Sequence, residues 1–259
     1  MEGENQMMPV VFVGHGSPMN AIEENEYTAG WREISAEIPR PDAILAVSAH
    51  WYTDRTRLMT QEKPKTIHDF YGFPRELYDI QYPVPGAPEL AARTMKLIGG
   101  DCLEDRTWGI DHGAWSVLRL MYPRADIPVV QMSIDKGLTP REMFDAGRKL
   151  KALREENVLI FGSGNVVHNL ALVDFSVRGG YPFADEFDAY IRDHIQDGDF
   201  SAVIEYKKAG ECAKHAFPTR EHFDPLLYVL GAADEKDQVK IYNEARMAGS
   251  LSMTSYVFS

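Results

Sequence analysis

Short apolar runs rich in β-branched residues alternate along this chain with segments of helical hydrophobic spacing. The runs that we predict to be buried strands are residues 10–13, 43–48, 127–134 and 158–161. The predicted helices are residues 25–37, 88–98, 114–122, 139–155, 183–195 and 225–233, and the alternating segment 250–258 is a candidate closing strand. Such a succession favours an α/β fold with a central mixed, largely parallel sheet flanked by helices.

The length of 259 residues is compatible with one large domain or two small ones. The sequence contains no internal repeat, no low-complexity stretch and no convincing linker, since 197–199 is too short to divide domains. We therefore predict that residues 1–259 form a single domain.

Charge and composition exclude several classes of partner. The formal net charge of -12 argues against nucleic acid, because binding to phosphates needs clustered Lys and Arg. No apolar run approaches the roughly 18 residues that span a bilayer, and the acidic N-terminus does not resemble a signal peptide. Only two cysteines, Cys102 and Cys212, are present, so we expect no disulfide framework and a cytoplasmic location. The remaining class of partner is a small molecule.

Four of the eight histidines lie where an apolar run gives way to glycines, small residues or a helix start. They are His15, His50, His168 and His222. In open α/β sheets, ligands bind outside the carboxyl ends of the strands. Imidazole is a common ligand of zinc, iron and copper. These histidines therefore suggest a metal site at one edge of the sheet.

His15 and His50 form the strongest pair in this set, although each alone is compatible with a structural, hydrogen-bonded histidine. Gly14 and Gly16 allow a sharp turn around His15, and the small residues before His50 leave room for its ring. If their strands are adjacent, the two imidazoles start about 4.8 Å apart. Two ligands at about 2.1 Å from one metal ion need a similar separation.

His168, His222 and His112 each allow two interpretations. His168 follows a Gly-Ser-Gly turn, which is a weak phosphate-binding signal and a better carrier of a histidine to the same edge. His222 precedes a helix, where it either points back to the sheet or faces water. His112, between two tryptophans, is either a proton-shuttling pocket residue or a core histidine. His194 and His215, in charged helical surroundings, are interpreted as surface residues.

The segment 61–88 is rich in proline and aromatic residues and lacks periodicity. Loops of this size are often lids or pocket walls. A surface connection anchored by its aromatic rings is the alternative. His68, within this loop, is a further residue that can reach a pocket.

Six motifs in order resemble the class III extradiol ring-cleaving dioxygenases, and among them the 4,5-DOPA dioxygenase branch. The motifs are Gly14-His-Gly-Ser-Pro-Met-Asn20, Ser48-Ala-His-Trp51, Thr66-Ile-His-Asp-Phe-Tyr-Gly-Phe-Pro74, Asp111-His-Gly-Ala-Trp115, Ser163-Gly-Asn-Val-Val-His-Asn169 and Glu221-His-Phe-Asp-Pro-Leu-Leu-Tyr228. Each motif is weak alone, but the set covers essentially the whole chain.

This resemblance implies a non-haem Fe(II) enzyme that opens a catechol ring beside its two hydroxyls with both atoms of O2. It implies that His15, His50 and His222 are the protein ligands of the metal. His168 is implied to be an acid–base residue near the metal that can also reach the ion. His112 is implied to contact substrate or oxygen.

The implied third ligand is a histidine, with Glu221 adjacent, where many extradiol enzymes use a carboxylate. Catalytic zinc also accepts an all-histidine set, so purified protein can carry Zn(II), which has no redox chemistry. Two alternatives follow. One is a zinc-dependent hydrolase that uses the same histidines, and the other is a non-catalytic binding protein on this fold, as in the distantly related Memo proteins.

Overall fold

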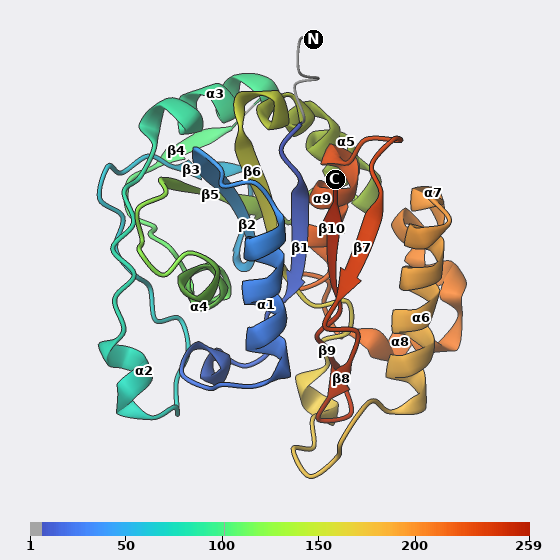
Figure 1. Ribbon diagram of the computed structural model, residues 1–259. Helices are drawn as coiled ribbons and strands as arrows, with labels where there is room; N and C mark the ends of the chain where they lie inside the picture. The colour runs from blue at the N-terminus through green and yellow to red at the C-terminus, as the bar shows by residue number, and fades with distance from the viewer. Residues whose placement is uncertain (1–6, 101) are drawn as a thin grey trace.

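A mixed eight-stranded sheet forms the centre of the protein, seen here in a computed structural model that describes residues 7–100 and 102–259 (Figure 1). The strand order is β4-β3-β5-β2-β6-β1-β10-β7. The bounds are β1 Val10–Gly14, β2 Ala43–Thr53, β3 Arg57–Met59, β4 Leu103–Asp105, β5 Val129–Asp135, β6 Val158–Gly164, β7 Val239–Tyr242 and β10 Ser255–Phe258. The four central strands β5, β2, β6 and β1 are parallel, and β10 and β7 continue the sheet antiparallel. The predicted α/β fold with a mixed, largely parallel sheet is confirmed.

Helices cover both faces of this sheet, which explains why the central strands are continuously apolar. Alternate residues of β1 belong to opposite hydrophobic cores: Val10 and Phe12 face one, and Val11 and Val13 face the other. The helices are α1 Glu26–Glu37, α2 Arg75–Asp79, α3 Pro88–Ile98, α4 His112–Met121, α5 Pro140–Leu150, α6 Pro182–Gln196, α7 Phe200–Ile204, α8 Glu211–Ala216 and α9 Asp224–Ala232. α1 and α4 pack on one face, whereas α5 and α9 pack against each other on the opposite face (Figure 1).

The structure differs from the predicted elements mainly at short or interrupted segments. The predicted helix 139–155 ends at Leu150 and continues as the 3-10 helix Lys151–Glu156. The predicted closing strand 250–258 is divided into β9 Leu251–Ser252, which pairs with β8 Arg246–Met247, and β10. β3, β4 and β7 have three or four residues each and no long apolar run, so sequence periodicity missed them. Within the ranges 7–100 and 102–259, no helix has the length and hydropathy needed to cross a bilayer.

The expectation that the strands of His15 and His50 are adjacent is wrong, because β6 lies between β1 and β2. β6 ends in Gly162-Ser163-Gly164, which pairs with the ends of both neighbours. These small residues leave space above the end of β6. Side chains from β1 and β2 can therefore meet across the intervening strand.

Helix α9, whose start follows His222, is held against α5 by a close glycine contact. A Cβ atom on Gly231 would overlap the carbonyl oxygen of Phe144, and one on Gly147 would overlap that of Tyr228. The two helix backbones therefore approach more closely than any larger residue permits. This contact fixes the helix that carries one wall of the histidine cluster.

We expect Gly231→Ala to lower the free energy of unfolding by about 1–3 kcal/mol, because the added methyl group forces α5 and α9 apart. Helix propensity alone acts in the opposite direction, since alanine is about 1 kcal/mol more favourable than glycine inside a helix. Urea denaturation of the two proteins measures the sign. A variant as stable as the parent or more stable would show that the contact is not tight.

Candidate metal centre and active site

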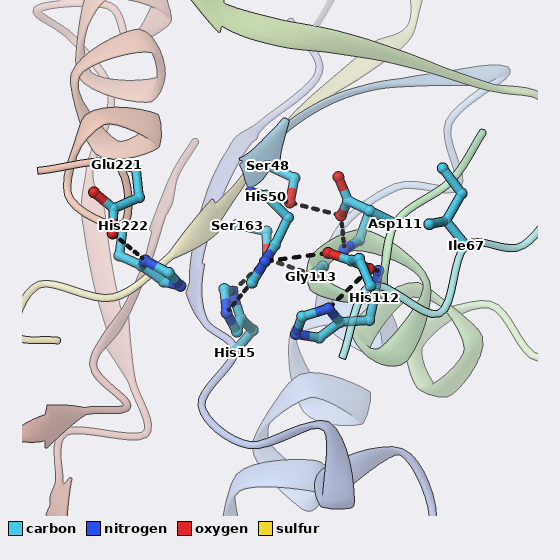
Figure 2. Close-up of polar contacts among 12 residues, drawn as sticks. His15, Ser48, His50, Ile67, Asp111, His112, Gly113, Ser163, Glu221 and His222 are labelled. Atoms are coloured by element: carbon cyan, nitrogen blue, oxygen red, sulfur yellow. Dashed lines mark hydrogen bonds and ion pairs between the residues drawn. The ribbon is translucent and has the colours of Figure 1, made fainter. Parts of the chain in front are cut away.

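Five imidazoles converge at the carboxyl end of the central strands, and Figure 2 shows those of His15, His50, His112 and His222. His15 follows β1, His50 lies within β2, and His112 begins α4. His168 follows β6 and His222 lies two residues before α9. The ring centroid of His15 lies 5.1 Å from that of His50, 5.9 Å from that of His112 and 5.3 Å from that of His222. All five predicted site histidines therefore lie together.

His15 and His50 face each other through Nε2 atoms that are 3.2 Å apart. The Ser163 hydroxyl donates its only proton to the Gly113 carbonyl at 2.5 Å, so it accepts from Nδ1 of His15 at 3.0 Å. Nδ1 of His50 lies 3.2 Å from Oδ2 of Asp69, a carboxylate that only accepts. Both histidines in their neutral form therefore carry the proton on Nδ1.

Two unprotonated Nε2 atoms then point their lone pairs at each other. While both rings are neutral they cannot form a hydrogen bond, because neither Nε2 carries a hydrogen, and a positive charge between them is needed to make the contact favourable. A separation of 3.2 Å is compatible with two nitrogen ligands that are each about 2.1 Å from one ion. These residues fit a bound metal cation on geometry and on the chemistry of the donor atoms.

Asp69 joins the second of these histidines to His112. Its Oδ1 lies 2.9 Å from Nδ1 of His112 and accepts from the backbone N–H of the same residue at 2.9 Å. Burial raises the pKa of the Asp69 carboxyl, but contacts with His112 and His50 outweigh burial and hold the pKa well below its ordinary value. Asp69 is therefore ionised at neutral pH.

Burial keeps most of the cluster in the neutral form that binds metals. It lowers the pKa of His15 and of His222 well below the ordinary value, and neighbouring histidines add to the effect. Burial and the charge of His50 lower the pKa of His112 and of His168 to about 4. Burial also acts to lower the pKa of His50, but Asp69 and Asp111 outweigh it, so this pKa lies above its ordinary value.

A buried network behind the cluster fixes the first turn of α4 against β2. Asp111 caps the helix by accepting from the N–H of Ala114, and the same oxygen accepts from the Ser48 hydroxyl at 2.7 Å. The Gln131 amide donates to the other oxygen of Asp111. Burial and the charge of Asp69 raise the pKa of Asp111 to about 6. The backbone positions of His50 and His112 are thereby linked.

His168 and His222 form the opposite side of the cluster, and their rings stack in parallel with centroids 3.5 Å apart. Nδ1 of His222 lies 3.4 Å from Oε1 of Glu221, which leaves its other nitrogen for the interior (Figure 2). In the described parts of the chain, the atoms that could bind a metal form two sets. Within each set, these atoms all lie within 4.8 Å of one another. One set is His15, His50 and His112, and the other is His168, Glu221 and His222.

The long loop 61–88 contributes an aromatic wall to this site. The Phe70 ring lies 5.4 Å from the ring of His112, and Phe73 and Tyr78 pack against Phe70. His68 does not join the imidazole cluster, because its Nε2 lies 2.9 Å from the carbonyl oxygen of Ile80.

The sequence analysis missed three contributors, Asp69, Ser163 and Gly113. All three lie inside motifs quoted above, so their positions carried a signal. Their contacts depend on strand order, which the motifs do not reveal. His215 is exposed as expected, and His194 is half-buried beside Asp199.

Residues 9–259 match the family described as the catalytic LigB subunit of aromatic ring-opening dioxygenase. The chain is 45% identical to a protein named 4,5-DOPA dioxygenase extradiol from Escherichia coli, over 96% of this chain and 93% of that protein. It is 36% identical to a protein of the same name from Beta vulgaris, over 100% of this chain and 99% of that protein. A crystal structure of an uncharacterized protein from Escherichia coli K12 superposes with a TM-score of 0.85 at 40% identity, covering 97% of this chain and 100% of that one.

The fold and the match along nearly the whole chain define an aromatic ring-opening dioxygenase. The chain belongs to the LigB family, whose members depend on a metal, and it is an extradiol ring-opening dioxygenase, an oxidoreductase. The predicted family is thus confirmed, and ring opening is favoured over the hydrolase and binding-protein alternatives.

Gly113 is required for the close approach of α4 to β2. A Cβ atom at this position would lie 2.6 Å from Oγ of Ser48 and 2.7 Å from Cδ2 of His50. We expect Gly113→Ala to displace the His50 imidazole and to weaken metal binding, with a loss of about 1–3 kcal/mol of stability. Titration with Zn²⁺ against a competing chelator and urea denaturation measure the two effects.

Gly137→Ala is the matched control, because Gly137 is exposed and its added Cβ meets only Asp135 Oδ1, at 3.2 Å, and no histidine of the cluster. Metal affinity within about twofold of the parent for both variants would contradict the crowding argument.

Proposed function

We propose that residues 1–259 act as one catalytic unit that opens the ring of a catecholic, DOPA-like substrate with O2 at an Fe(II) centre, to give a hydroxymuconic semialdehyde. The observation that carries this proposal is the pair of facing Nε2 atoms of His15 and His50 inside a cluster of five imidazoles. The relatives named 4,5-DOPA dioxygenase extradiol supply the substrate class.

His15, His50 and His222 would hold the ion in this proposal. The ring of His222 lies 5.3 Å from that of His15 and 5.1 Å from that of His50, and Glu221 accounts for its Nδ1 proton. When bound, Fe(II) supplies Lewis-acid activation of the catechol oxygens and the electrons that make O2 reactive.

His168 accepts a proton from a catechol hydroxyl. It is neutral at physiological pH, because burial lowers its pKa to about 4, and it is the more exposed partner of the stacked pair. His112 acts as the second acid–base residue of the proposed reaction. Asp69 fixes its Nδ1 side, so the other ring nitrogen can take up a proton during ring opening and return it to the product.

The loop 61–88 walls the pocket and limits access of water through Phe70, whose ring packs beside His112. An apolar wall also suits the flat ring of a catechol.

Protein stripped of metal and loaded anaerobically with Fe(II) should consume O2 and form a visible-absorbing product when mixed with L-DOPA. Mass spectrometry with ¹⁸O2 should find both oxygen atoms in the product, because ring opening inserts the whole molecule. The Zn(II)-loaded protein should be inactive. Absence of O2 uptake with Fe(II)-loaded protein across a panel of catechols would reject the proposal.

The two candidate third ligands can be separated by alanine variants. His222→Ala should weaken Fe(II) or Zn(II) binding by more than the 10- to 100-fold typical of losing an outer-shell partner, because a ligand atom is removed. His112→Ala should retain the metal and lose turnover. His215→Ala, which removes an exposed imidazole outside the cluster, is the matched control. A reversal of the two results would place His112 rather than His222 on the metal.

A further inference from the structure

We infer that Asp69 is a positioning residue that sets the tautomer of both His50 and His112 and so aims their Nε2 atoms into the site. This inference rests on the proposed role of His50 as a metal ligand. It assigns a function to a loop residue that touches neither the substrate nor the ion.

Asp69 is shared between two histidines that come from different elements. Oδ2 lies 3.2 Å from Nδ1 of His50 on β2, and Oδ1 lies 2.9 Å from Nδ1 of His112 at the start of α4. Oδ1 also accepts the backbone N–H of His112 at 2.9 Å, which fixes the orientation of the carboxylate. The side chain is 18% exposed, so this bridge is largely shielded from water.

A carboxylate offers only acceptors, so an Nδ1 atom that lies 2.9 to 3.2 Å from it must carry its proton, although the contact with His112 is a close ion-pair distance and not an aligned hydrogen bond. The Nε2 atom of each neutral ring then presents a lone pair, as a metal ligand or a proton acceptor needs. The rings of His50 and His112 lie 3.9 Å apart, so a single group on this side can orient both. Figure 2 shows the imidazoles of His50 and His112 close together, with His222 on the other side of the cluster.

The bridge also fastens the long loop to the site. Asp69 precedes Phe70, whose ring lies 5.4 Å from that of His112. The interaction that orients the two imidazoles therefore also holds the Phe70 ring beside His112.

Asp69→Asn tests the inference with almost no change in shape. The asparagine oxygen can replace Oδ1, where it accepts the backbone N–H of His112, and this orientation turns the NH2 group toward Nδ1 of His50. Two donors cannot face each other, so His50 must move its proton to Nε2 and lose the lone pair that faces the metal. We expect Co²⁺ and Zn²⁺ affinity to fall 10- to 100-fold, with the urea midpoint of the metal-free protein unchanged.

Histidine ¹⁵N NMR of the metal-free protein reads the tautomers directly and needs no variant. In the parent protein, His50 and His112 should both be protonated on Nδ1 when neutral, and in Asp69→Asn the signal of His50 should change to the Nε2-protonated form. Asp69→Ala should weaken binding no more than Asp69→Asn, because water can accept from Nδ1 where an amide NH2 cannot. A purely structural role predicts the opposite order.

Asp79→Asn is the matched control, since Asp79 lies in α2 of the same loop with a side chain that is 67% exposed. A parent protein that binds no Co²⁺ or Zn²⁺ would overturn the metal centre itself. A parent that binds while Asp69→Asn binds equally well with unchanged histidine signals would overturn only the role of Asp69.

Discussion

The opposition of two nitrogen lone pairs is the interaction on which the site depends. His15 and His50 approach to 3.2 Å between Nε2 atoms, with both protons committed to Ser163 and Asp69 on the outer sides of the rings. When both rings are neutral and neither a metal ion nor a proton lies between them, this arrangement is repulsive, and water cannot relieve it easily because both rings are largely buried. The protein thus holds in place a geometry that becomes favourable when a positive ion lies between the two nitrogens.

The fold supplies this geometry through the end of one strand. β6 separates β1 from β2, and its terminal Gly-Ser-Gly leaves room for imidazoles to meet above it. Ser163 in that strand then serves both neighbours. Its hydroxyl accepts from His15 on the β1 side and donates to Gly113 at the start of α4, which lies against β2. A larger residue at Gly164 would collide with the backbone of His222, so the same strand end also admits the opposite wall of the cluster.

The sequence contained enough information to place the central strands, the longer helices and the five histidines, because the carboxyl ends of parallel strands in an α/β sheet lie at one edge whatever their order. It did not contain the strand order itself. Adjacency of β1 and β2 was the natural assumption for consecutive strands, yet the β6 insertion depends on crossovers that periodicity does not encode. For the same reason Asp69 could not be assigned a partner. Its motif was visible, but its contacts join a loop, a central strand and a helix that are far apart in the chain.

The two carboxylates behind the cluster, Asp69 and Asp111, lie at different depths and have different functions. Asp69 is ionised and faces ring nitrogens, so it acts on the tautomers. Asp111 lies one layer deeper, where burial raises its pKa to about 6, and it bonds to Ser48, Gln131 and the first turn of α4. Two adjacent carboxylates in a buried site repel each other, and the less accessible one takes the higher pKa. As the pH falls below about 6, Asp111 is therefore protonated first, and the negative charge remains on the carboxylate that contacts the imidazoles, where a bound cation would gain most from it. The deeper carboxylate holds β2 and α4 at the spacing that this contact requires.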